Sequence, residues 1–250
     1  MRVLVFSSVM ACLSTTASFA APVASLHPEG RPDGIALKDN DYPADAMTTI
    51  RPVARPELAP QSVAKNPGFQ TWIKEFRKRA VVQDISSATL NRAFNGVTYD
   101  PEVIRRDRNQ SEFTTSIWEY LDSAVSDKRI ENGKEALRLH YQQLQQIEAT
   151  YGVDKEVVLA VWGMESSYGT FRGNMDVIRS LSTLAFDGRR GKFFESQLIA
   201  ALQILQSGDV PPREMTGSWA GAMGHTQFIP TSYLAYAVDY TGDGKRDIWS

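Results

Sequence analysis

From Gly68 onward, apolar residues recur in this 250-residue chain at the spacing of helix faces, and segments that alternate like strands are few. Segments with helical spacing lie at 69–81, 85–96, 112–125, 130–152, 155–169 and 191–208, and another begins after Pro230. Serine and glycine residues stand where helix starts and stops are expected, for example at the two ends of "ISSATLNRAFNG". We therefore predict a mainly α fold.

Three of these segments carry more detailed predictions. An apolar stripe on the third segment is formed by Phe113, Ile117, Trp118 and Leu121. The 130–152 segment predicts a continuous helix closed by Gly152. The 155–169 segment is so apolar that its helix is expected to be mostly buried.

The first twenty residues have the features of an export signal. Arg2 precedes an apolar run at 3–10, and small residues at Ser18 and Ala20 fit a cleavage site. The run is too short for a membrane span, which needs about 20 residues. We expect an exported, periplasmic protein. The alternative is an outer-membrane lipoprotein attached through Cys12, although Met10 fits that motif poorly.

Residues 21–66 are rich in proline, alanine and small polar residues, and they predict a disordered tether. The expected organisation is a signal peptide at 1–20, the tether at 21–66 and a catalytic domain at 67–250. Because Cys12 is the sole cysteine and there are three histidines, the mature chain is expected to lack disulfides and structural zinc. A formal net charge of −2 argues against a nucleic-acid partner.

One acid stands in an unusual setting. In "VWGMESSYG" (161–169), Glu165 follows Val161, Trp162 and Met164 and precedes small residues. Loss of water disfavours the charged form of a carboxylate and raises its pKa. An acid kept protonated near neutral pH can act as a general acid. The alternative is an ordinary exposed glutamate at a helix end.

A second stretch, "GSWAGAMGHTQFIPTSY" (217–233), combines three glycines with polar and aromatic residues. Ser218 and Gln227 offer neutral hydrogen-bonding groups that suit sugar hydroxyls. Trp219 and Phe228 could be platforms for sugar faces or ordinary core residues. From spacing alone, the stretch could also be a tight loop between helices.

These stretches, with "RSLSTLAFDGRR", "FFESQLIAALQIL" and the continuation of the second stretch to "DYTGDGKRDIW", resemble the lytic transglycosylase B family over roughly residues 67–250. The resemblance implies a lysozyme-like helical fold that cuts the β-1,4 bond between N-acetylmuramic acid and N-acetylglucosamine in peptidoglycan. Glu165 falls on the family's single catalytic acid/base, and Ser218 and Gln227 fall on residues lining its cleft. The chemistry implied needs no cofactor.

Most glycosidases use two carboxylates, whereas the mechanism implied by the resemblance uses one. Glu165 would protonate the leaving oxygen and then accept the proton of the muramoyl C6 hydroxyl, which closes a 1,6-anhydro ring. Asp176, Asp187 and Glu195 remain candidates for a second acid, although each lies in a polar or turn-like context.

The last twelve residues, "DYTGDGKRDIWS", resemble a calcium-binding loop. Candidate ligands are Asp239, Thr241, Asp243, Lys245 through its backbone carbonyl, and Asp247. The alternative is a polar turn, because Thr241 is neutral and Ser250 replaces the usual final acid. The resemblance favours a structural calcium. Because the sequence stops inside this loop, we expect a shortened form of a longer protein.

Two other functions remain open. A hydrolytic muramidase would use water in place of the C6 hydroxyl, and a non-catalytic module would bind peptidoglycan without cutting it. The apolar setting of Glu165 argues against pure binding. The expected partners are glycan strands and proteins of wall synthesis or remodelling, and the chain is expected to be a monomer.

Overall fold

The structure, a computed structural model, describes residues 66–109 and 116–250. The predicted signal peptide with Cys12, nearly all of the predicted tether and Phe113 lie outside these residues. The helices are α1 Pro67–Val82, α2 Ser87–Ala93, α3 Pro101–Arg108, α4 Ile117–Ala124, α5 Asp127–Leu139, α6 Tyr141–Tyr151, α7 Lys155–Ser166, α8 Val177–Asp187, α9 Gly191–Ser207 and α10 Pro230–Tyr236. The strands are β1 Met175–Asp176 and β2 Thr216–Gly217. The predicted mainly α fold is confirmed.

Local chemistry explains where the predicted helices begin and end. The side chain of Asn66 accepts the N–H of Phe69 at 3.2 Å and starts α1. The predicted serine cap of α2 is Ser86, whose hydroxyl accepts the N–H of Thr89 at 3.1 Å. At its other end, α9 stops at Gly208, which has the left-handed φ of 86° that glycine adopts without strain.

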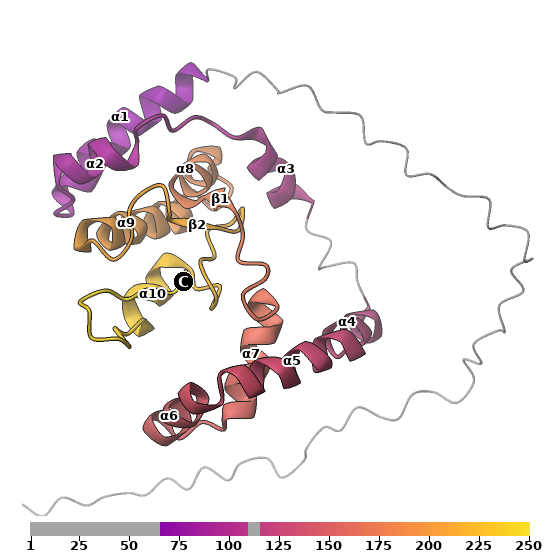
Figure 1. The fold of residues 1–250 in the computed structure, drawn as a ribbon. Coiled ribbons are helices and arrows are strands. Elements are labelled where there is room, and N and C mark those ends of the chain that lie inside the picture. Colours follow the sequence, from indigo (N-terminus) through magenta and orange to yellow (C-terminus); the bar gives the residue numbers. More distant parts are fainter. Residues whose placement is uncertain (1–65, 110–115) are drawn as a thin grey trace, which may run out of the picture. The chain divides into compact units, whose positions relative to one another are not determined.

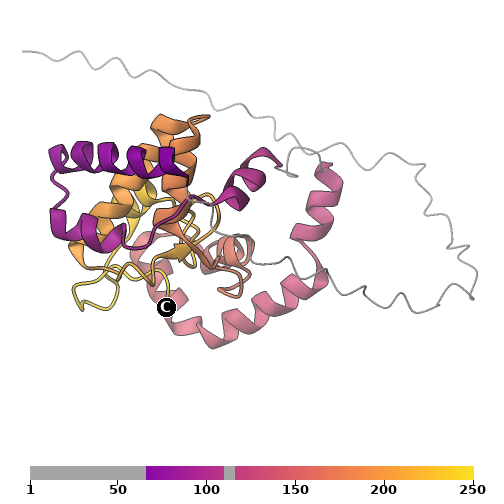
Figure 2. The same cartoon turned by 90° about the horizontal axis from the view of Figure 1, so that it is seen from above.

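The main core is built around α8 and α9, which pack against each other (Figures 1 and 2). Leu181 on α8 and Leu198 and Leu202 on α9 are fully buried. Helices α1 and α3 contact α8, and α2 and α10 contact α9. Each buried leucine contributes about 1.5–3 kcal/mol of transfer free energy, so this pair of helices anchors the elements around it.

A second apolar cluster joins α5, α6 and α7 through Ala136, Leu144 and Leu159. The prediction of one helix over 130–152 was wrong, because the chain leaves helical geometry at His140, with φ −111° and ψ 19°. The break lets α5 and α6 each contact α7. The predicted stop at Gly152 is confirmed by its left-handed conformation.

Helix α4 forms within the predicted 112–125 segment, and its start is fixed by a capping box between Ser116 and Glu119. Its apolar stripe does not face a core in the part of the chain that is described, because Ile117, Trp118 and Leu121 are exposed. The spacing therefore predicted the helix correctly but says nothing about what covers its apolar face.

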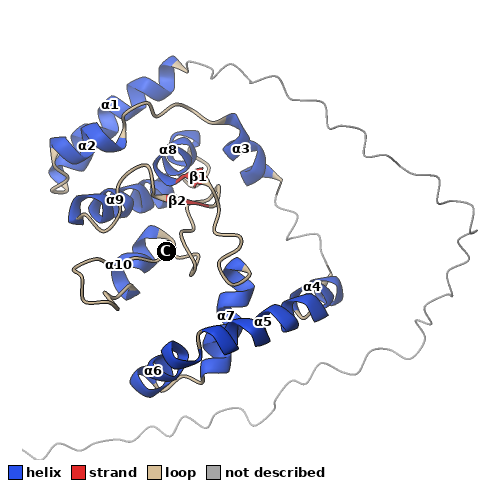
Figure 3. Ribbon diagram, in the orientation of Figure 1, coloured by secondary structure: helices blue, strands red, loops and turns tan. Residues whose placement is uncertain are grey.

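Sequence analysis missed α3, α8 as a helix, and both strands. The pattern for α8 is present, since Asp176 accepts the N–H of Arg179 at 2.8 Å as an N-cap, and apolar residues follow at helical spacing. The strands pair antiparallel, Met175 with Gly217 (Figure 3). At two residues each, they are too short to show an alternating pattern.

Within the described ranges, no helix combines the length and the apolarity that crossing a bilayer requires.

Candidate active site

Glu165 lies in the last turn of α7. The helix ends there because Ser167 and Tyr168 both take left-handed conformations, with φ of 48° and 57°. Glu165 is exposed, and no described residue gives its carboxylate a hydrogen bond or an ion pair. The carboxylate is therefore free to meet a ligand from solvent.

The expected burial of α7 was wrong. Its buried residues are Leu159, Gly163 and Ser166, which form one narrow stripe. Leu159 packs in the cluster with α5 and α6, and the Ser166 hydroxyl bonds to His225.

Of the apolar residues thought to enclose Glu165, Trp162 is partly buried and packs against the second apolar cluster, whereas Val161 and Met164 lie on the exposed side of the helix. Val161 is 54% exposed and Met164 is 42% exposed. The apolar residues of the motif that are exposed therefore form a surface beside Glu165 and do not enclose it.

The segment after Glu165 packs closely against the loop between β2 and α10. Gly169 and Gly173 allow this approach, with φ of 82° and 79°. A Cβ on Gly169 would lie 2.2 Å from the ring of His225, and one on Gly173 would lie 2.2 Å from the backbone of Gly217. A side chain at either position would push the segment after Glu165 away from His225 or Gly217. The fold thereby brings the two sequence motifs together.

Ser218 and Gln227 both lie in this loop and maintain its shape. The Ser218 hydroxyl accepts the backbone N–H groups of Ala220 and Ala222 at 3.3 and 3.1 Å. The Gln227 amide donates to the carbonyls of Arg172 and Gly224 at 3.1 and 2.8 Å. Among the described residues, none bonds to the hydroxyl proton of Ser218 or to the amide oxygen of Gln227, so both groups can meet a ligand.

Trp219 and Phe228 both pack, partly buried, against the main core. Between the two interpretations that the sequence left open, the structure favours core residues.

His225, one of the three histidines in the sequence, bonds to α7 where that helix meets the loop between β2 and α10. Its Nδ1 accepts the indole N–H of Trp162 at 2.9 Å, and its backbone carbonyl accepts the hydroxyl of Ser166 at 2.8 Å. Burial, followed by the positive charge of Arg172, holds the pKa of His225 below its ordinary value, although Asp247 acts in the opposite direction. The ring is therefore neutral at neutral pH.

With this geometry established, sequence comparison identifies the family. Residues 68–250 match the family described as the transglycosylase SLT domain. The chain belongs to that family.

Individual proteins that resemble this chain are also lytic transglycosylases by name or belong to the SltB group. The membrane-bound lytic murein transglycosylase B of Escherichia coli K12 is 32% identical over 131 residues, which are 52% of this chain and 36% of the relative. SltB3 of Pseudomonas aeruginosa, solved in complex with NAG-anhNAM-pentapeptide, is 53% identical with a TM-score of 0.71, over 73% of this chain and 48% of SltB3.

A third relative, the Escherichia coli lytic transglycosylase Slt35 in complex with calcium, is 28% identical with a TM-score of 0.63, over 76% of this chain and 60% of Slt35. The mainly helical domain of this chain has the Slt35 fold. The chain spans less than two thirds of the length of each of these three relatives.

Each of the three alternative acids of this SLT domain has a structural partner. Asp176 caps α8, Asp187 pairs with Arg108 at 2.8 Å, and Glu195 pairs with Arg79 at 2.8 Å. Glu165 has no such partner among the described residues, which favours it as the acid of the SLT domain.

A hollow of about 210 Å³ opens beside the turn that follows Glu165. Its walls are Ser126, Lys128, Arg129 and Asn132 on the α5 side and Ser167, Tyr168, Thr170 and Phe171 on the other. Phe171 is 72% exposed and could stack on a sugar ring. The four residues on the α5 side were not predicted, because they lie far from Glu165 along the chain.

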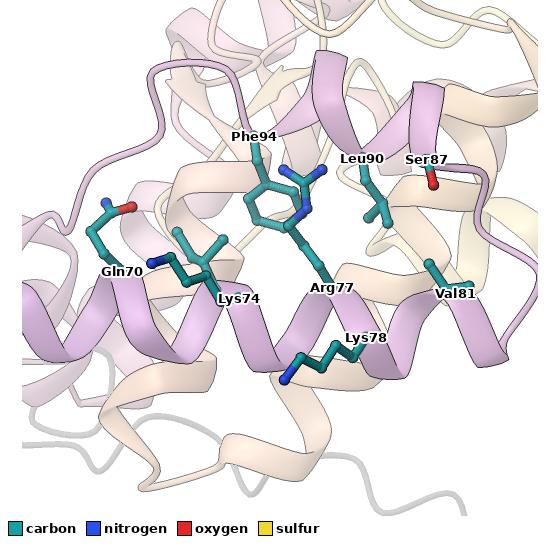
Figure 4. Close-up of a pocket in the computed structure, with 9 residues that line it drawn as sticks. Gln70, Lys74, Arg77, Lys78, Val81, Ser87, Leu90 and Phe94 are labelled. Carbon is teal, nitrogen blue, oxygen red and sulfur yellow. The ribbon is translucent and has the colours of Figure 1, made fainter.

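A larger groove of about 490 Å³ runs between α1 and α2, and Figure 4 shows its lining. Lys74, Arg77 and Lys78 line it together with the apolar residues Leu90 and Phe94. No carboxylate is among its lining residues.

The predicted calcium loop is a set of tight turns around Asp239. Its carboxylate accepts the N–H groups of Gly242 and Gly244 at 2.7 and 2.8 Å, which holds its pKa below the ordinary value, with the bond from Gly244 the largest cause. Asp243 accepts the N–H of Lys245 at 2.9 Å. Across the described ranges, no three His, Cys, Asp or Glu side chains converge on one point as metal ligands. Oxygen donors of this kind suit calcium, but the carboxylates of the described loop do not converge on one point.

Proposed function

We propose that this protein is a peptidoglycan lytic transglycosylase with Glu165 as its single acid/base. The main support is the combination of the family match over 68–250 with an exposed carboxylate that has no partner among the described residues and lies next to Ser166, which bonds to the 217–233 stretch. The bound NAG-anhNAM-pentapeptide of SltB3 supports both the substrate class and the anhydro product.

The chemistry follows from one carboxyl group used twice. Glu165 donates its proton to the glycosidic oxygen as the bond to muramoyl C1 breaks, and N-acetylglucosamine leaves as an alcohol. The substrate's own N-acetyl group stabilises the positive charge at C1. The C6 hydroxyl then bonds to C1 and gives its proton to the Glu165 carboxylate, which restores the acid. Water is not consumed, and the product carries a 1,6-anhydro ring.

Product analysis and one substitution test the proposal. Glu165→Gln keeps the shape of the side chain but removes the proton, so we expect a loss of about 10²–10⁴-fold or more in turnover of purified peptidoglycan. Glycan binding should persist, since Ser218 and Gln227 are unchanged. Glu195→Gln, at an acid with a structural partner, is the control and should retain turnover.

The mass of the wild-type product separates the mechanisms. After borohydride reduction, anhydro muropeptides should be about 20 mass units lighter than the hydrolytic product. Reducing muramic ends would instead show the alternative hydrolytic muramidase. Binding without any cleavage by the wild type would show a peptidoglycan-binding module.

We also propose that the loop at 239–250 binds a structural calcium ion through Asp239, Thr241, Asp243, the Lys245 carbonyl and Asp247. Support comes from the spacing of these oxygen donors and from the calcium complex of Slt35. The ion would hold the turns of the loop together and take no part in proton transfer.

For the N-terminal residues, we propose export to the periplasm after cleavage behind Ala20, with 21–66 as a tether to the domain at 67–250. Attachment to the outer membrane through Cys12 is the second candidate. Relatives whose names describe them as membrane-bound and as soluble are both known. Proteins of wall synthesis or remodelling are the proposed partners of a monomeric enzyme.

A further inference from the structure

We propose that His225 is a positioning residue that fastens the last turn of α7, and with it Glu165, to the loop carrying Ser218 and Gln227. This inference rests on the proposed function. It assigns His225 a role in turnover that does not involve contact with the reacting atoms.

The ring of His225 forms the first of two attachments to α7. Its Nδ1 accepts the indole N–H of Trp162 at 2.9 Å, and its Nε2 lies 3.2 Å from a guanidinium nitrogen of Arg172. Both neighbours are donors, and a neutral imidazole has one accepting nitrogen. Since the indole has a single N–H and directs it at Nδ1, the ring proton is on Nε2. The Arg172 guanidinium donates instead to the carbonyl of Trp249.

The backbone of His225 forms the second attachment. Its carbonyl accepts the hydroxyl of Ser166 at 2.8 Å, and that hydroxyl also accepts the N–H of Gly169 at 3.1 Å. On the opposite side, the N–H of His225 donates to the carbonyl of Ile248 at 2.8 Å. The residue is therefore bonded to α7 and to the C-terminal segment at the same time.

The two attachments flank the acid. Trp162 lies three residues before Glu165, and Ser166 lies directly after it, so both bonds restrain the turn from which the carboxylate projects. Gln227, two residues beyond His225, is bonded to the Arg172 carbonyl at 3.1 Å, which holds the loop to the same segment. His225 thus sets where the acid stands relative to the polar groups of the loop.

Loss of the ring bond should therefore reduce turnover more than binding. A displacement of about 1 Å of a catalytic group can cost about 10²-fold in rate. We expect His225→Leu to lower kcat on purified peptidoglycan about 10- to 100-fold, with KM changed by less than about 3-fold. His225→Asn puts an accepting oxygen at the position of Nδ1 and should keep kcat within about 3-fold of wild type.

Trp162→Phe supplies the matched test, because it removes the donor and keeps an aromatic ring. It should lower kcat by about the same factor as His225→Leu, and the double variant should show no further loss. The proposal would be overturned by wild-type kcat in His225→Leu, by an Asn variant as impaired as the Leu variant, or by fully multiplicative losses in the double variant. A rise in KM at unchanged kcat would equally overturn it.

A measurement without substrate separates this inference from the proposed function. The chain has five tryptophans, so its ¹H–¹⁵N spectrum should show five indole signals, and Trp162→Phe identifies the one lost. That signal should move in His225→Leu and return toward its wild-type position in His225→Asn. If the wild type cuts no glycan but the signal behaves this way, the proposed function fails while the attachment stands. An unmoved signal in His225→Leu refutes the attachment itself.

Discussion

Replacing Gly163 by alanine should destabilise the protein, although alanine normally stabilises a helix. Gly163 lies inside α7, and a Cβ there would come within 2.5 Å of both Cζ and the hydroxyl oxygen of Tyr168. That ring occupies the space between α5 and α7. Its hydroxyl donates to the carbonyl of Arg129 at 3.1 Å, and its edge meets Trp162 at a centroid distance of 5.7 Å.

The size of the effect follows from what Tyr168 loses when it is displaced. The hydrogen bond is worth about 1 kcal/mol and the aromatic pair also about 1 kcal/mol. Partial exposure of the ring costs about 1 kcal/mol more. Against this loss of about 3 kcal/mol, alanine gains about 1 kcal/mol of helix propensity over glycine. We expect a net loss of about 2 kcal/mol in the free energy of unfolding.

Urea unfolding followed by tryptophan fluorescence measures this change, and a second background tests its cause. In Tyr168→Ala the obstructing ring is gone, so Gly163→Ala should become stabilising by about 0.5–1 kcal/mol. Gly133→Ala, whose Cβ would come within 2.6 Å of the same hydroxyl, should show the same reversal of sign. Equal destabilisation by Gly163→Ala in both backgrounds would refute the reasoning.

Two other predictions concern the C-terminal part. Calcium at millimolar concentration should raise the melting temperature of the chain, and Asp243→Ala should abolish the rise; a rise that persists in Asp243→Ala would contradict the assigned ligands. Burial alone would raise the pKa of Asp209, but bonds from Ser207 and Arg246 outweigh it and hold this pKa below the ordinary value of 3.8. This stabilisation is present above pH 3.8 and is lost as the pH falls through the lower folded value, so Asp209→Asn should cost about 2 kcal/mol in urea unfolding at pH 7 and progressively less as the pH falls below 3.8. A pH-independent difference would contradict this explanation.

The helices that were predicted correctly have local signals. The Ser86 cap, the Gly208 stop and the apolar spacing of α9 all lie within the segments that they define. Burial was less predictable, because it depends on which elements meet. The spacing of apolar residues in the sequence is the same whether a helix face packs against other elements, as in α9, or is exposed, as in α4.

The same distinction applies to the candidate site. The residue types around Glu165 indicated a catalytic acid, and the stretch at 217–233 indicated polar groups that could bind a sugar. Their proximity depends on Gly169 and Gly173, whose role is visible only once both segments are folded. His225 was missed for the same reason, since its three attachments reach residues more than twenty positions away.

The exposure of Glu165 bears on how a single acid could serve both steps. A carboxyl group that must first hold a proton and then accept one works best where water is excluded. In the described chain water reaches Glu165, and Val161, one turn earlier on the same face, is exposed beside it. A glycan strand bound along this face would cover both residues and remove water from the acid and from the apolar surface together. The apolar residues that the sequence assigned to an enclosure would then form one wall of it, and the substrate would form the other. Under the proposed mechanism, Glu165 would therefore acquire its catalytic environment only when the strand is bound.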